Sequence, residues 1–235
     1  MPSGKWAAEG RGGDGRGAFR RPAEKGENMD RFFEWFGLPG EMVLAAVLFL
    51  LAAVLALVFP NRARILAAAG MLCCALGDAL AINFLDVGRF LPFPPLLAGL
   101  AFFSLGRAGY TAAYASLIRR NRDPLSTPPF GAAVVITLAF LAAAMVAMVT
   151  GGTYPGGAAV ALCVLYALSS GSMLAVVWSC SRSERSVRSA AAAGALALFA
   201  VDVVYGLGVL CQMHQLDGLI WWVYPFAQLL LLQCA

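Results

Sequence analysis

The chain has 235 residues, of which 60% are hydrophobic and 13% are charged, and its formal net charge is +4 at pH 7. Soluble domains carry about 25% charged residues, and long apolar runs fill this sequence from Met42 onward, which excludes an ordinary soluble globular protein. The basic residues flank the apolar runs and form no continuous stripe, so no nucleic-acid partner is expected. The runs are too long for barrel strands, and the sequence therefore predicts an all-α, polytopic bundle of transmembrane helices.

Residues 1–28 differ in kind from the rest of the chain. They are rich in Gly, Arg and Glu and have no apolar period, which predicts a disordered tail. They also lack the apolar segment of a signal peptide. The alternative is that translation starts at Met29 and that the tail is not made. Residues 29–235 are expected to form a single transmembrane helical domain, with a short interfacial turn over residues 30–37.

Seven apolar segments follow, and each is close to the length of about 20 residues that crosses a bilayer. They cover residues 42–59, 65–85, 95–118, 130–150, 156–178, 189–211 and 219–235. The first, third and fifth loops between them hold eight arginines, whereas the second, fourth and sixth hold only Arg89. Because Lys and Arg are retained in cytoplasmic loops, this predicts an N-out, C-in topology in a plasma membrane of the bacterial inner-membrane type.

Two aspartates and one arginine lie inside these segments. Asp78 and Asp202 each stand 13 residues from the cytoplasmic start of a segment, and Arg107 stands 11 residues from a cytoplasmic end. At 1.5 Å per residue, all three lie roughly 17 to 20 Å from one membrane surface. Ionisable groups at such a depth are costly and generally functional. We expect them to share a cavity, with Arg107 within about 4 Å of one carboxylate. The alternative is an ion pair that only joins helices.

Helical spacing brings further polar side chains to the same centre. We expect six residues to bind the substrate or to support the site, namely Arg107, Tyr110, Tyr166, Tyr205, Tyr224 and Gln228. The six cysteines form no C-x-x-C pair and are expected to be small buried hydrophobes. His214 is the only histidine, which argues against a zinc site. Neither a metal nor another cofactor is expected.

Four segments resemble, in the same order, helices of the YhhN-like family, which includes the lysoplasmalogenases. These are LCCALGDAL around Asp78, GLAFFSLGRAGYTAAY around Arg107, ALFAVDVVYGL around Asp202, and VYPFAQLLLLQCA at the C-terminus. The chain departs from the family pattern at Arg107, which stands where the family has a histidine, and at Val201, which stands where it has a serine. One N-terminal helix of the family also has no counterpart here.

The resemblance implies hydrolysis of the vinyl ether bond of a lysoplasmalogen, which gives a fatty aldehyde and a glycerophospho-alcohol. Such bonds hydrolyse through rate-limiting proton transfer to the β-carbon and need an acid that is protonated near pH 7. Removal from water favours the protonated form of a carboxyl group. We expect Asp78, among apolar neighbours, to be the general acid and Asp202, near Tyr205, to be its ionised partner. The substrate would be a single-chain lipid that enters from the bilayer.

Two other functions fit the same residues. A transporter of small solutes or lipids also uses Asp and Arg at the midplane, although this chain has no visible internal repeat. A lipid-binding relative without catalytic activity would use Arg107 to hold both aspartates in a structural triad. The lipid headgroup, the chain length and the oligomeric state stay open.

Overall fold

The computed structural model describes residues 40–91, 94–121, 127–150, 157–180, 187–211 and 217–234. The predictions for residues 1–39, which include the disordered tail and the interfacial turn, lie outside this range. Within it the chain forms seven long helices and one short segment of 3₁₀ turns. These are α2 (Gly40–Val58), α3 (Arg62–Ala81), η1 (Phe84–Phe90), α4 (Pro95–Asn121), α5 (Thr127–Thr150), α6 (Gly157–Cys180), α7 (Val187–Cys211) and α8 (Asp217–Cys234).

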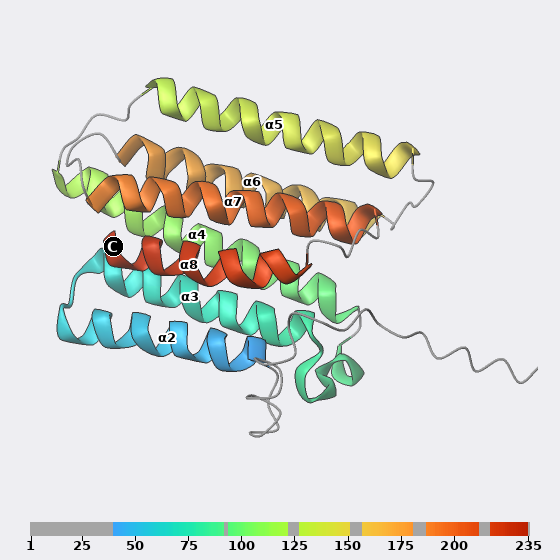
Figure 1. The fold of residues 1–235 in the computed structure, drawn as a ribbon, viewed down its shortest axis with the longest axis horizontal. Helices are drawn as coiled ribbons and strands as arrows, with labels where there is room; N and C mark the ends of the chain where they lie inside the picture. Colours follow the sequence, from blue (N-terminus) through green and yellow to red (C-terminus); the bar gives the residue numbers. More distant parts are fainter. Residues whose placement is uncertain are drawn as a thin grey trace, which may run out of the picture.

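The seven long helices lie side by side with nearly aligned axes, with α2 at one edge of the bundle and α5 at the opposite edge (Figure 1). Helix α3 packs on α2 and α4, α4 packs on α6, and α7 packs on α6 and α8. Each predicted segment corresponds to one long helix, and the described residues contain no strand. The predicted all-α fold is therefore confirmed.

The outer surface of the bundle is apolar. Leu50, Leu57, Val135, Val146 and Phe226 are each at least 60% exposed. By length and hydropathy, three described segments are long enough to cross a bilayer, namely Arg62–Ala81, Val160–Cys180 and Ser189–Gly206. A fourth is added if η1 and Pro95–Arg120, which is nearly all of α4, make one bent span, and α2 and α5 hold shorter apolar stretches. Such a surface suits lipid contact, and the protein is a multi-pass helical membrane protein.

Helix α3 ends earlier than the apolar run predicts. The run continues to residue 85, but the helix ends at Ala81 and Asn83 adopts a left-handed conformation with φ of 53°. The side chain of Asn83 accepts a hydrogen bond from the backbone N–H of Gly88 at 2.7 Å and donates one to Asp86 Oδ1 at 3.1 Å. Asparagine tolerates this conformation and commonly ends helices. Asp78 consequently lies near the end of α3.

Glycines bring α3 and α4 into backbone contact. A Cβ atom at Gly70 would lie 2.9 Å from the carbonyl oxygen of Gly106, and one at Gly109 would lie 2.7 Å from the Cα of Gly70. Small residues at helix contacts permit such an approach in membrane proteins. One consequence is that Cys74 of α3 reaches Arg107 of α4, with 3.4 Å between Sγ and Nη1.

Candidate functional site

A buried ion pair joins α4 to α7. Arg107 donates from Nε to Asp202 Oδ2 at 2.9 Å and from Nη2 to Asp202 Oδ1 at 2.7 Å. The two residues are 1% and 3% exposed. A guanidinium and a carboxylate joined by two parallel hydrogen bonds form a strong and directional pair. The ion pair expected for Arg107 is thus present, and its partner is Asp202.

Two hydroxyl groups of α6 complete the coordination of Asp202. Tyr166 Oη donates to Oδ1 at 2.5 Å, and Ser170 Oγ donates to Oδ2 at 2.5 Å. With the two bonds from Arg107, each carboxylate oxygen accepts two hydrogen bonds, which is close to the full capacity of an ionised carboxylate.

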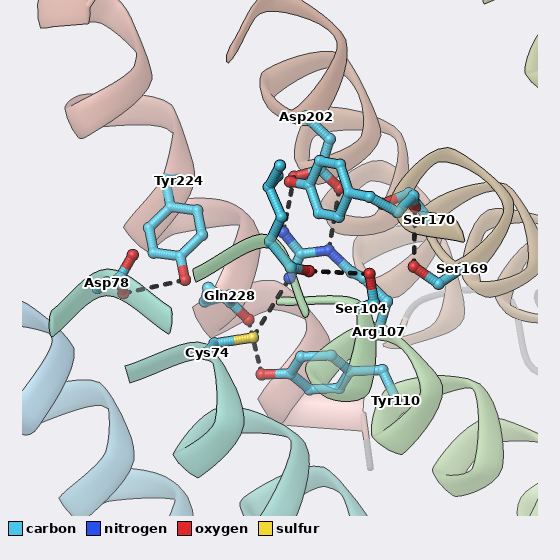
Figure 2. A network of polar contacts seen from close by, with 12 residues as sticks. Cys74, Asp78, Ser104, Arg107, Tyr110, Ser169, Ser170, Asp202, Tyr224 and Gln228 are labelled. Carbon is cyan, nitrogen blue, oxygen red and sulfur yellow. Dashed lines mark hydrogen bonds and ion pairs between the residues drawn. The ribbon is translucent and has the colours of Figure 1, made fainter. Parts of the chain in front are cut away.

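Asp78 has a different environment. Its Oδ2 accepts a hydrogen bond from Tyr224 Oη at 3.3 Å, which is long for an O–H···O bond, and its side chain is 5% exposed. Figure 2 shows Asp78 and Tyr224 facing each other on one side of the site, with Asp202 and Ser170 on the other. The two aspartates therefore lie on opposite sides of one site, and Arg107 is bonded to Asp202.

One cavity of about 60 Å³ lies between α3, α4, α6, α7 and α8 and brings these groups together. It is lined by Asp78, Ala81, Phe103, Arg107, Tyr166, Val201, Asp202, Tyr205, Ile220 and Tyr224. This volume has room for a few water molecules. The predicted convergence of Asp78, Arg107 and Asp202 is confirmed, and three of the four expected tyrosines contribute to the lining.

Tyr110 and Gln228 lie behind the cavity instead of lining it. Tyr110 Oη donates to Gln228 Oε1 at 2.6 Å and also lies 3.4 Å from Met71 Sδ. Both side chains are completely buried, and within the described part of the chain Gln228 Nε2 has no hydrogen-bond partner. These two residues join α4 to α8 beneath the site.

The depth of the site is close to the expectation. Asp78 is 16 residues from the start of α3, Asp202 is 15 residues from the start of α7, and Arg107 is 14 residues from the end of α4. At 1.5 Å per residue these spacings are roughly 21 to 24 Å, so the three charged residues share a layer as expected, slightly deeper than 20 Å. Because Asn83 ends α3 early, Asp78 is also only three residues from the other end of its helix.

Two further residues contribute to the site, of which Ser170 is expected from the sequence only as part of a polar face shared with Tyr166 and Ser169. Ser170 bonds Asp202, and Cys74 contacts the guanidinium of Arg107. Their only signals in the sequence are helical spacings, since Ser170 is four residues after Tyr166 and Cys74 is four residues before Asp78. Within the described ranges, no group of His, Cys, Asp and Glu side chains is arranged to hold a metal ion.

Comparison with known proteins assigns the family. The model of the YhhN family matches residues 41–235, which include every helix from α2 to α8 and every residue of the cavity. Comparisons with curated proteins and with solved structures gave no match. The match agrees with the four resemblances around Asp78, Arg107, Asp202 and the C-terminal segment, and the chain belongs to the YhhN family.

Proposed function

We propose that this protein hydrolyses the vinyl ether bond of a lysoplasmalogen inside the membrane and releases a fatty aldehyde and a glycerophospho-alcohol. The observation that carries the proposal is a single buried cavity with two aspartates in unequal surroundings. Asp202 forms an ion pair with a guanidinium and accepts bonds from two hydroxyls, and Asp78 accepts a bond of 3.3 Å from Tyr224 on the other side of the cavity. Different environments suit different protonation states, which is what an acid and its ionised partner require.

In the proposed first step, the protonated carboxyl group of Asp78 transfers its proton to the β-carbon of the vinyl ether. The π electrons of the double bond form the new C–H bond, and the α-carbon and ether oxygen become an oxocarbenium ion. The carboxylate left on Asp78 then lies beside this cation and stabilises it electrostatically. Arg107 offsets the charge of Asp202, so Asp78 supplies most of this stabilisation.

In the second step, water adds to the α-carbon, and its proton returns to Asp78. The resulting hemiacetal breaks its C–O bond to the glycerol oxygen, which takes up the hydroxyl proton, and an aldehyde remains. The hydroxyl of Tyr166 donates a hydrogen bond to Asp202. The hydroxyl oxygen of Tyr166 can therefore accept a hydrogen bond from this water. The pair of Asp202 and Arg107 holds Tyr166 in place and has no net charge.

A lipid-binding function without catalysis is the second candidate. The observation in its favour is that Asp202 is saturated by Arg107, Tyr166 and Ser170, as in an ion pair that only joins helices. It predicts that single-chain lipids bind and no aldehyde is formed.

The experiment that separates the two measures aldehyde release by the purified protein from 1-alkenyl lysophospholipids of several headgroups. We expect Asp78→Asn to lower the rate by about 10²- to 10⁴-fold, because proton donation is lost. Asp202→Asn should leave a residual rate, because water still reaches the cation. The matched control is Asp86→Asn, which changes an exposed aspartate in η1 and should match the wild type.

Wild-type protein that binds these lipids and releases no aldehyde would overturn the proposed hydrolysis. If Asp202→Asn is inactive and Asp78→Asn retains activity, the roles of the two aspartates are reversed. Gel-filtration profiles of all variants in detergent identify any loss of rate that comes from misfolding.

A further inference from the structure

A second cavity of about 40 Å³ lies beside the first, between α4, α5, α6 and α7. We call it the apolar slot and define it by Phe140, Ala144, Cys163, Ala167 and Gly206. The rest of its lining is aliphatic apart from Met145 and two tyrosines. Apart from the two tyrosine hydroxyls, such a lining offers no partner for a charged or hydrogen-bonding headgroup, and a hydrocarbon matches it.

The slot and the polar cavity share Tyr166 and Tyr205, so the two tyrosines stand between them. Tyr166 directs its hydroxyl to Asp202 at 2.5 Å, while its ring also lines the slot. The two compartments are therefore neighbours, one apolar and one polar, with an amphipathic wall between them. A lipid is divided in the same way, into an apolar hydrocarbon chain and a polar glycerol end.

The slot also reaches the lipid-facing surface of the bundle. Met145 lines it and is 47% exposed, and α5 is the edge helix in Figure 1. The slot is narrow, because a Cβ atom at Gly206 would lie 3.4 Å from Phe140 Cζ on the opposite wall. Small side chains at Ala144 and Ala167 keep it open.

We propose that the apolar slot binds the hydrocarbon chain of a single-chain lipid that enters from the bilayer between α5 and α7. The inference rests on the proposed function for the position of the reacting bond, which would follow the chain past Tyr166 and Tyr205 to Asp78. The binding step itself does not depend on hydrolysis. Helix α5 contributes no residue to the polar cavity. Under this proposal its role is to help select the substrate by contact with the hydrocarbon chain.

The test uses an ester-linked lysophosphatidylcholine with a diazirine in its acyl chain, which has no vinyl ether bond to cleave. Irradiation of the full chain in detergent should crosslink the lipid to α5 and α6 near Ala144 and Cys163, and excess unlabelled lysolipid should compete. Ala144→Phe fills the slot and should lower crosslinking at least tenfold. The matched control is Ala143→Phe on the exposed side of the same helix, which should retain it.

A second measurement needs no substitution. Cys163 is a free, half-buried thiol in the slot, and Cys73 is a free, half-buried thiol on α3 outside it. Lysolipid should slow the alkylation of Cys163 by a membrane-permeant maleimide several-fold and leave the rate at Cys73 unchanged. Protection of neither thiol, crosslinks confined to α2 or α8, or crosslinks between two protein copies at the slot would each overturn the inference.

The two proposals fail separately. Crosslinking in the slot with no aldehyde from any vinyl ether lipid would support the slot and overturn the proposed hydrolysis. Aldehyde release with Cys163 unprotected and crosslinks elsewhere would overturn the slot and leave the hydrolysis standing.

Discussion

Arg107 and Asp202 compensate each other's charge inside the bundle, where both side chains are almost fully buried. Desolvation of two charges offsets much of their attraction, so such a pair adds little net stability compared with two apolar residues. Removal of one partner is different, because the other charge stays buried and uncompensated. Loss of one partner should therefore lower the free energy of unfolding more than replacement of both partners does.

This argument predicts a strong coupling between the two positions. Arg107→Met should lower the free energy of unfolding by about 3 kcal/mol, and the double variant with Asp202→Asn should recover much of that loss. Unfolding in detergent, followed by circular dichroism, measures both. The control is Arg89→Met, which breaks the exposed pair with Asp86 and should change stability by less than about 1 kcal/mol. Additive effects at positions 107 and 202 would contradict the prediction.

The central charged residues could be predicted from the sequence because an ionisable residue inside an apolar membrane segment is costly and generally functional. Ser170 could be predicted only as a polar residue on the face of Tyr166, since serine is common in membrane helices and nothing but this spacing connects it to Asp202. Tyr110 shows the opposite error. Helical spacing places it on the same face as Arg107, but spacing alone does not tell a cavity wall from the layer behind it.

At the scale of the helix, the contact of α3 with α4 sets the position of Arg107. Gly70 and Gly109 meet backbone to backbone, and neither neighbour has a flexible side chain that can move aside. Any side chain at this contact must separate the two helices. Separation would also move Arg107 away from Cys74 and change its angle to Asp202.

We therefore expect Gly109→Ala to destabilise the protein, although alanine is the better helix former by about 1 kcal/mol. A Cβ atom there would lie 2.7 Å from the Cα of Gly70, and overpacking of this kind costs about 1 to 3 kcal/mol. The control is Gly131→Ala on α5, where no heavy atom lies within 4 Å of the added carbon. Unfolding in detergent should rank Gly131→Ala at or above the wild type and Gly109→Ala below it. Equal stabilities would contradict the role of this contact.

The helices themselves could be predicted, because apolar runs of this length have few alternatives in a bilayer. The end of α3 was predicted less well. Apolar content shows which residues suit lipid and continues through Leu85, whereas the backbone turns at Asn83 through local hydrogen bonds to Gly88 and Asp86. The order in which helices pack could not be predicted either, since nearly every helix has apolar residues on all sides.

At the scale of the whole molecule, the described arginines at the start of α3 and the end of α4 lie at one end of the bundle. Arg62, Arg119 and Arg120 line a single groove of about 540 Å³ between the start of α3 and the end of α4. Asp78 lies near the opposite end of α3. The orientation in the membrane therefore decides which leaflet lies nearer the polar cavity.

The last prediction is that this arginine-rich end faces the cytoplasm, with the N-terminus outside and the C-terminus inside. Eight of the nine arginines in the predicted loops belong to the first, third and fifth loops, and such loops resist translocation. A cysteine at Ser183, between α6 and α7, in a version without native cysteines should react with an impermeant maleimide only after the cells are permeabilised. A cysteine at Thr153, between α5 and α6, should react in intact cells.

The reverse labelling pattern would invert the topology. With the N-terminus outside, Asp78 lies one turn from the outer end of its helix, and lysolipids of the outer leaflet have the shorter path to the cavity. With the N-terminus inside, the same geometry would make inner-leaflet lipids the nearer substrates. The labelling result therefore also selects the leaflet from which a substrate should be supplied in reconstituted membranes.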